Sequence, residues 1–194
     1  MLDQCAAYLI ARNESHTRAL ERLANRLGFL HVEPLFSRKS FKPIESHPVL
    51  KFFLMYRHMD EQLMITVRDV IRACSDPNIR YAPIILFAED CDFESYLGFV
   101  KMGFDDILTL PDKKDMLVKR LESQVNADHT YFETATYLGP DRRRMEAPGH
   151  TDPRRGGEQQ SRLKHTIHRT VSGGSAATQS EYFSHSKTSK VTRG

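Results

Sequence analysis

The sequence predicts an α/β domain with a five-stranded, doubly wound parallel sheet, followed by a largely disordered C-terminal tail. Five short apolar runs alternate with segments of helical period over residues 1–126, and the runs are apolar almost throughout. Strands of this kind occur in parallel sheets whose two faces are covered by helices and whose crossovers are right-handed. Aliphatic residues become sparse over residues 127–194, too sparse to offset the entropy cost of ordering the chain.

The first strand is expected at residues 6–11, whose sequence AAYLIA is a continuous apolar run. The next segment has the helical period, and its expected inward face consists of Leu20, Leu23, Ala24 and Leu27. Asn13 or Ser15 can cap the start of this helix, and Gly28 can end it. Residues 31–36 form a weaker strand, because the proline within them cannot donate a sheet hydrogen bond.

The middle of the domain contains the strongest strand candidate, the apolar run at residues 49–56. Before it, residues 37–48 are polar and contain two prolines, so a helix there is expected to be short or irregular. After Asp60 a helix is expected, and the residues that would face the core are Leu63, Val67, Val70, Ile71 and Cys74.

The last two strands are expected at residues 83–88 and 107–110, with the sequences PIILFA and ILTL. An acidic turn and a helix separate them, and the helix carries Tyr96, Phe99 and Val100. A final helix places Leu117, Leu121 and Val125 inward. Five strand–helix repeats complete the predicted domain at residues 1–126.

The tail differs from the domain in charge. Residues 1–126 hold 17 basic and 18 acidic side chains, whereas residues 127–194 hold 11 and 7, with seven of the ten glycines. Two parts of this low-complexity tail have enough apolar surface for order: residues 131–144, as a docking segment, and residues 161–171, as a short helix. In that helix Leu163, Ile167 and Val171 would share one face.

Several classes of protein are disfavoured. No apolar run has the length that crosses a bilayer, and the first ten residues do not resemble a signal peptide, so a cytoplasmic protein is expected. Cys5, Cys74 and Cys91 are odd in number and widely spaced, which favours free thiols. The glycine-rich motifs of dinucleotide and P-loop sites are absent, as is a serine in a GxSxG turn.

The run at residues 83–88, the acidic turn after it and the segment GFVKMGFDDILTLP from Gly98 to Pro111 resemble bacterial response-regulator receiver domains. The resemblance is most specific there and extends with less detail to residues 1–126. It implies a flavodoxin-like fold with ligand chemistry at the carboxyl ends of the strands. In receivers that crevice holds a magnesium ion, a phosphoacceptor aspartate, a serine or threonine, and a lysine.

This chain departs from the receiver pattern at each of those positions. The acidic pair that holds the metal aligns with Arg12 and Asn13, although hard cations need carboxylate oxygens. The phosphoacceptor aligns with Met55 or Tyr56, neither of which can form an acyl phosphate. The hydroxyl, lysine and switch-aromatic positions align with Ala88, Leu110 and Ile107. Asp60, beyond the third strand, is an alternative acceptor that would need positioned neighbours.

These departures indicate a degenerate receiver, or pseudo-receiver, with no phosphoryl chemistry, enzyme activity, metal or cofactor. The resemblance implies two-component or phosphorelay signalling through protein binding that is independent of phosphorylation. The implied partner is a histidine kinase, a phosphotransfer protein or another regulator, and a homodimer is a further expectation. Candidate partner-binding residues are Tyr96, Phe99, Tyr137, Arg142, Arg143 and Arg144.

The arginine run follows Gly139 and Pro140, which are expected to set a turn, and a similar GPDRRR run follows some bacterial receiver-like domains. Arginine forks bind carboxylates and phosphates, so the run is a docking peptide, a phosphate contact or a solvated linker. The alternative function is nucleic-acid association through the basic tail, which would be sensitive to salt.

A third hypothesis is an enzyme with an unfamiliar site, for which Asp105 and Asp106 are the first candidates. A turn that enters the last strand explains these two residues better. His165 and His168 are three residues apart, but they lack the further ligands of a metal site.

Overall fold

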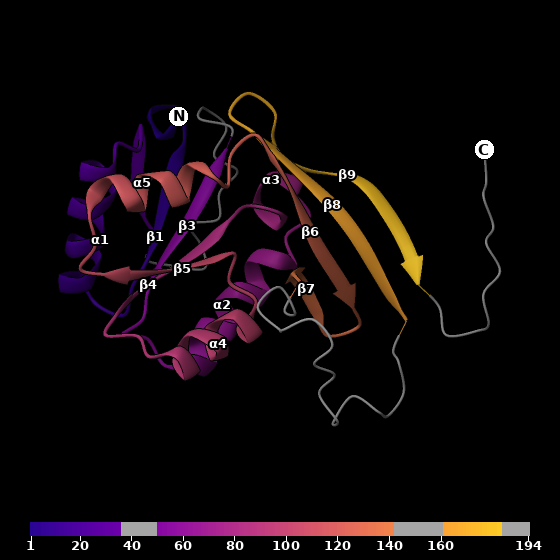
Figure 1. Cartoon of the computed structure of the whole chain (residues 1–194), viewed down its shortest axis with the longest axis horizontal. Helices are drawn as coiled ribbons and strands as arrows, with labels where there is room; N and C mark the ends of the chain where they lie inside the picture. The colour runs from indigo at the N-terminus through magenta and orange to yellow at the C-terminus, as the bar shows by residue number, and fades with distance from the viewer. Residues whose placement is uncertain (36–49, 142–160, 184–194) are drawn as a thin grey trace.

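The computed structural model of the chain describes residues 1–35, 50–141 and 161–183 (Figure 1). Its first sheet consists of five parallel strands in the order β2-β1-β3-β4-β5, which confirms the predicted fold class. The strands are β1 (Ala6–Ile10), β2 (His31–Pro34), β3 (Lys51–Tyr56), β4 (Ile84–Glu89) and β5 (Asp106–Leu110). This is the flavodoxin-like strand order.

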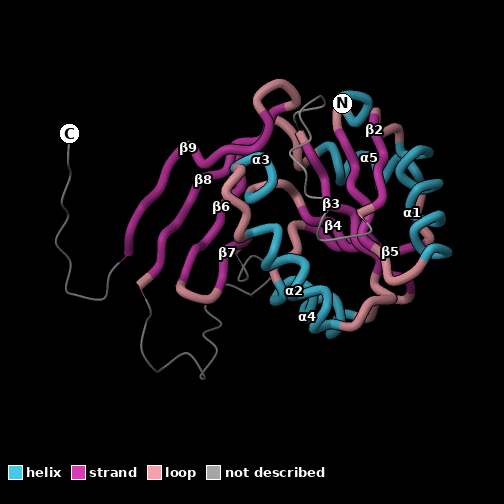
Figure 2. The backbone as a smooth tube through the Cα atoms, turned by 180° about the vertical axis from the view of Figure 1, so that it is seen from behind, coloured by secondary structure: helices cyan, strands magenta, loops and turns pink. Residues whose placement is uncertain are grey.

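Helices cover both faces of the parallel sheet, as the apolar strands require. Leu20 and Leu23 of α1 and Leu117 of α5 pack in one core, and Met64 of α2 and Phe99 of α4 pack in the other. Figure 2 shows α1 and α5 on one side of the strands, with α2 and α4 on the other. The helical elements are η1 (Leu2–Gln4), α1 (Glu14–Leu27), α2 (Glu61–Arg72), α3 (Pro77–Arg80), α4 (Phe93–Met102) and α5 (Lys114–Glu122).

Helix α1 begins and ends where the sequence predicts. The side chain of Asn13 accepts a hydrogen bond from the backbone nitrogen of His16 at 2.9 Å, which is an N-cap. Gly28 follows the helix in the left-handed conformation with φ 97°, a conformation that glycine adopts without a side-chain penalty. The predicted cap at Asn13 and stop at Gly28 are confirmed.

The predicted inward face of α2 needs a correction. Leu63 and Val70 are exposed, whereas Arg68 and Arg72 are buried beside Met64 and Ile71. Both arginines have acceptors within the protein: Arg68 donates to the backbone oxygen of Met102, and Arg72 donates to that of Ala82 at 2.7 Å. The spacing of apolar residues alone misplaces the buried face of α2, because Arg68 and Arg72 occupy part of that face.

A second, antiparallel sheet follows the α/β domain, with strand order β7-β6-β8-β9. Its strands are β6 (Ala127–Thr134), β7 (Tyr137–Pro140), β8 (Arg162–Thr170) and β9 (Gly174–Phe183). The expectation of a largely unstructured tail is therefore corrected for residues 127–141 and 161–183. The inner face of this sheet has a small apolar cluster of Tyr131, Leu138 and Ile167 with Tyr81, and the buried polar residues His165 and Arg169 complete it. A count of aliphatic residues underestimates this core, because Tyr131, His165 and Arg169 fill part of it.

The short helix expected at residues 161–171 is wrong, because this stretch contains strand β8. Leu163, Ile167 and Val171 are four residues apart, a spacing that puts residues on one face of a helix and equally on one face of a strand. In β8 the buried residues alternate with partly exposed ones, and His165, Ile167 and Arg169 face inward. The hydrophobic pattern alone could not distinguish the two structures.

The predicted turn at Gly139-Pro140 is also wrong. Both residues lie in β7, and the hairpin between β6 and β7 turns at residues 135 and 136. Residues 36–49, 142–160 and 184–194 lie outside the described part of the chain. The expectations for residues 37–48 and for Arg142, Arg143 and Arg144 therefore fall outside it as well.

Candidate functional site

Strands β1, β3, β4 and β5 end at one edge of the parallel sheet, where open α/β sheets bind ligands. A cavity of about 380 Å³ opens at this carboxyl edge beside α1. It is lined by Ala19, Leu20, Leu23, Arg26, Tyr56, Glu89, Asp90, Leu110, Pro111 and Asp112. The candidate site of the α/β domain is this edge.

Four side chains cluster at the edge: Tyr56 at the end of β3, His58 just after it, His16 on α1, and Glu89 at the end of β4. The rings of His16 and His58 are stacked with centroids 4.7 Å apart, and Tyr56 lies 4.9 Å from His58. The hydroxyl of Tyr56 donates to Glu89, and His58 Nε2 lies 3.8 Å from the same carboxylate. We call these four residues the edge cluster. His16, His58 and Glu89 carry no signal in the sequence, because the receiver pattern points to the positions beside them.

Burial governs the chemistry of Tyr56. Burial and the hydrogen bond to Glu89 raise the pKa of Tyr56 to about 12, so the phenol stays protonated at neutral pH. A protonated phenol donates one hydrogen bond and lacks the negative charge that hard cations prefer in their oxygen ligands. The residue at the end of β3 therefore closes this part of the edge with a neutral side chain.

The other positions predicted for the degenerate receiver site lie within or directly after strands β1, β3, β4 and β5. Arg12 is in the turn after β1 and Asn13 is the cap of α1. Met55, Ala88 and Ile107 are fully buried in strands and Leu110 is partly buried. Asp60 accepts from the backbone nitrogens of Gln62 and Leu63 at 2.9 and 3.3 Å, which makes it the N-cap of α2.

The residues present at the edge do not fit the magnesium ion that receivers hold. Within the described ranges, no three His, Cys, Asp or Glu side chains are grouped as metal ligands. Glu89 accepts a hydrogen bond from Tyr56, and Arg57 donates to the backbone oxygen of Glu89 at 3.2 Å.

Among the described residues, no helix has both the length and the hydropathy of a membrane span.

The predicted partner-binding residues are not equally accessible. Tyr96 on α4 is partly buried, but Phe99 is only 3% exposed and packs in the core with Arg57 5.5 Å from its ring centroid. Tyr137 packs against Arg68, and its hydroxyl donates to the backbone oxygen of Pro140 at 2.7 Å. The assignment of Phe99 to a docking surface is therefore corrected, because its side chain is buried, whereas Tyr96 and Tyr137 are partly exposed and their assignment stays a prediction.

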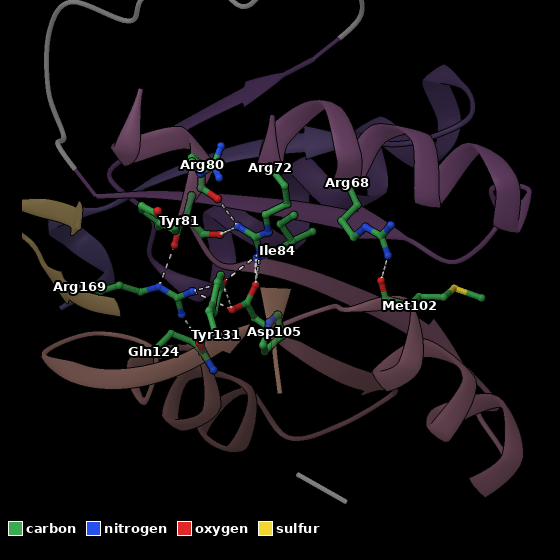
Figure 3. Close-up of polar contacts among 12 residues, drawn as sticks. Arg68, Arg72, Arg80, Tyr81, Ile84, Met102, Asp105, Gln124, Tyr131 and Arg169 are labelled. Carbon is green, nitrogen blue, oxygen red and sulfur yellow. Dashed lines mark hydrogen bonds and ion pairs between the residues drawn. The ribbon is translucent and has the colours of Figure 1, made fainter. Parts of the chain in front are cut away.

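A second polar cluster, which the sequence does not reveal, joins the two sheets around Asp105 (Figure 3). Asp105 lies just before β5 and forms ion pairs of 2.7 Å with both Arg72 of α2 and Arg169 of β8. The Tyr131 hydroxyl donates to Asp105 at 2.5 Å, and the backbone nitrogen of Ile84 donates to it at 2.8 Å. We call Arg72, Asp105, Tyr131 and Arg169 the junction cluster.

The junction cluster is almost completely excluded from water, and its one negative charge, on Asp105, lies between two arginine charges. Burial alone would raise the pKa of Asp105, but Arg169 and Arg72 hold it far below its usual range. Asp106 is also engaged, because Arg120 Nε donates to it at 3.1 Å. The two aspartates thus have structural partners, and the hypothesis of an enzyme site at these residues gains no support.

The basic character of the tail is partly internal. Arg169 is fully buried, and the guanidinium of Arg162 lies over the rings of Phe132 and Phe183 at 4.9 and 5.7 Å. His168 pairs with Asp128 at 2.7 Å. Lys164 of β8 is less tightly held, since its contact with Glu181 is 3.9 Å long and both side chains are exposed.

Comparison with known proteins finds similar solved structures but no matching sequence family. No family model matches the chain, and no curated protein matches it. A response regulator of Chloroflexus aurantiacus is 17% identical with a TM-score of 0.44, over 61% of this chain and 94% of its own. Full-length FixJ of B. japonicum is 20% identical with a TM-score of 0.44, over 61% of this chain and 56% of its own. The signal receiver domain of a histidine kinase of Syntrophus aciditrophicus is 21% identical with a TM-score of 0.41, over 62% and 91%.

The class of the protein rests on its own strand order and on its edge. It is a doubly wound α/β domain of the flavodoxin-like order, extended by a four-stranded antiparallel sheet. The carboxyl edge carries a tyrosine, two histidines and a glutamate.

Proposed function

We propose that this chain is a receiver-like signalling module that binds a protein partner in a two-component pathway and is not phosphorylated. The observation that carries the proposal is the edge cluster. The side chain at the end of β3 is a buried, protonated tyrosine bonded to Glu89, where a phosphoacceptor carboxylate would have to be accessible. Phosphoryl transfer needs a positioned nucleophile and a cation, and the edge supports neither.

Exposed apolar residues around the same edge support protein binding there. Leu63, Phe93 and Met116 are 46%, 68% and 50% exposed, and each lies in the first turn of a helix. Helices α2, α4 and α5 follow β3, β4 and β5, so their first turns surround the carboxyl edge. Large apolar side chains gathered on a surface mark contact sites for other proteins.

A phosphorylation assay tests the first half of the proposal. The full chain is incubated with a small phosphodonor and magnesium, and acid-labile phosphate is measured against an authentic receiver. We expect no stoichiometric labelling. Asp60→Asn is the matched variant, because asparagine keeps the N-cap while removing the carboxylate. Labelling of the natural chain that disappears in this variant would identify Asp60 as a displaced acceptor and refute the proposal.

A binding assay tests the second half. Histidine kinases and phosphotransfer proteins from the source organism are titrated with the full chain, with and without phosphodonor. We expect equal affinity in both conditions and weaker binding by the double variant Phe93→Ser and Met116→Ser. Leu30→Ser is the control, because Leu30 is 63% exposed at the opposite edge. Salt-sensitive binding to nucleic acid in place of protein binding would favour the alternative function.

A further inference from the structure

Strand β9 is the long outer strand of the antiparallel sheet. It is ten residues long and pairs with β8 along one side. Within the described ranges no other strand pairs with it. Its first residues are covered, because the backbone nitrogen of Ser175 donates to Asn78 of α3 at 3.0 Å. All eight residues from Ala176 to Phe183 are exposed. Figure 1 shows this strand at the outer side of the molecule, away from the α/β domain.

The other sheet edges in the described part of the chain are short or protected. Strand β2 has four residues, and β5 has five. Strand β7 has four residues, ends in Pro140, and is held against α2 through Tyr137 and Arg68. Short strands and proline are the usual means by which proteins prevent pairing of exposed edges. Edge β9 has neither, and its sequence contains no lysine, arginine or proline; its register against β8 shifts at Thr178, which leaves residues 179–183 as the regular part of the edge.

We propose that β9 is a homodimer interface, in which two copies of the chain join edge to edge into one eight-stranded antiparallel sheet. A self-pairing occupant fits because the free edge carries one charge, Glu181, and otherwise small, polar or aromatic residues. Pairing of one edge with its own copy satisfies the free backbone groups of both molecules through a single two-fold contact. This inference does not depend on the proposed function at the carboxyl edge.

Symmetry restricts the register of the pairing. A two-fold axis that joins antiparallel strands in one sheet is perpendicular to that sheet, so each residue keeps its face and the axis passes between two copies of one residue. We place the axis at Ser180, near the middle of the free edge. Gln179 of one copy then faces Glu181 of the other, twice, as an amide and carboxylate pair. A register centred on Glu181 would oppose two like charges.

The same axis places both α/β domains on one side of the joined sheet. Tyr182 lies opposite Leu163 of β8 and therefore shares the inner face with the buried His165 and Ile167. It is 64% exposed although it extends this inner face. In the dimer Tyr182 lies opposite Thr178 of the other copy, the residue at which the register of β9 against β8 shifts, so this contact adjoins the irregular part of the edge.

Sedimentation velocity of the full chain over a wide concentration range tests the proposal. We expect a reversible dimer, with a dissociation constant on the order of micromolar, because a strand pair is a small interface. In the variant Gln179→Lys with Glu181→Lys, lysines oppose lysines twice, so the dissociation constant should rise about tenfold or more.

The control carries the same charge change on the same face of an interior strand. Asp128→Lys with Thr130→Lys lies on β6, whose residues 128 and 130 are exposed but distant from the free edge. It should dimerise like the natural chain. A monomer at all concentrations, or equal dimerisation of the edge variant, would overturn the proposal.

Hydrogen exchange provides a readout that needs no variant. The alternate backbone amides of residues 178–183 that point to the free edge should become more protected as the concentration of the natural chain rises, while those of β7 should not change. Protection of β9 that is independent of concentration would argue against the interface even where the edge variant fails to fold.

Discussion

The guanidinium of Arg169 donates to the carboxylate of Asp105 at 2.7 Å, across a junction where both side chains are excluded from water. The two residues are 64 positions apart: Asp105 lies just before β5 of the parallel sheet, and Arg169 belongs to β8 of the antiparallel sheet. Arg169 also donates to Gln124 at 2.7 Å and to the backbone oxygen of Tyr81 at 3.2 Å. One side chain of β8 thus anchors the antiparallel sheet to three parts of the α/β domain.

Replacement of this anchor should destabilise the whole chain. Arg169→Met removes one partner of a buried ion pair and leaves Asp105 with a single arginine, so we expect a loss of about 3–5 kcal/mol in the free energy of unfolding. Urea denaturation of the full chain measures it. Arg162→Met, on the outer face of the same strand, should cost less than about 1 kcal/mol. Equal losses in the two variants would contradict the anchoring role.

The stability should fall in mild acid because of His129. Burial and the nearby Arg169 lower the pKa of His129 from 6.5 to about 4. Between those values the unfolded chain binds a proton that the folded chain does not, so stability decreases as the pH falls through this window. At 1.36 kcal/mol for each pKa unit, the full difference between the two pKa values would be worth about 3.4 kcal/mol. We expect a smaller loss of about 2 kcal/mol, because His129 keeps some contact with water.

The variant His129→Gln should remove most of this slope, as measured by urea denaturation at several pH values. His31→Gln is the control, because His31 is exposed at the start of β2. A slope that persists in His129→Gln and disappears in His31→Gln would assign the effect to the wrong residue.

Three glycines should respond differently to alanine. Gly103 has φ 93°, and a Cβ atom there would lie 2.7 Å from the ring of Tyr137. Gly103→Ala should therefore cost about 2 kcal/mol or more. Gly28→Ala has the positive φ without the contact and should cost about 1 kcal/mol. Gly98→Ala lies within α4 with free space around it and should stabilise by up to about 1 kcal/mol. Thermal unfolding of the three variants checks this order.

Asp60 should behave as a cap. Asp60→Ala leaves the backbone nitrogens of Gln62 and Leu63 without their acceptor and should cost about 1 kcal/mol, measured by urea denaturation. Asp60→Asn should be close to neutral. A large effect of the asparagine variant would mean that the charge of Asp60 matters beyond the cap.

Local pattern determined the α/β domain. The strands at residues 6–11, 49–56 and 83–88 are continuous apolar runs because both faces of a parallel sheet are covered. Their positions therefore follow from the local order of apolar residues alone. The caps of α1 at Asn13 and Gly28 are local hydrogen-bond and backbone requirements. The unusual character of the carboxyl edge also follows from the sequence, since Met55, Tyr56 and Ala88 occupy strand ends.

Tertiary structure decided what the polar residues do. The spacing of Leu163 and Ile167 fits a helix and a strand equally, and β8 became a strand because its neighbours β6 and β9 supply hydrogen bonds. Arg72 and Arg169 occupy core positions although composition assigns arginine to the surface. Their burial is stable only because Asp105 and Tyr131, distant in sequence, bring compensating charge and hydrogen bonds to the same place. A linear pattern contains no information about that meeting, since burial of a charge depends on its partners and not on its neighbours along the chain.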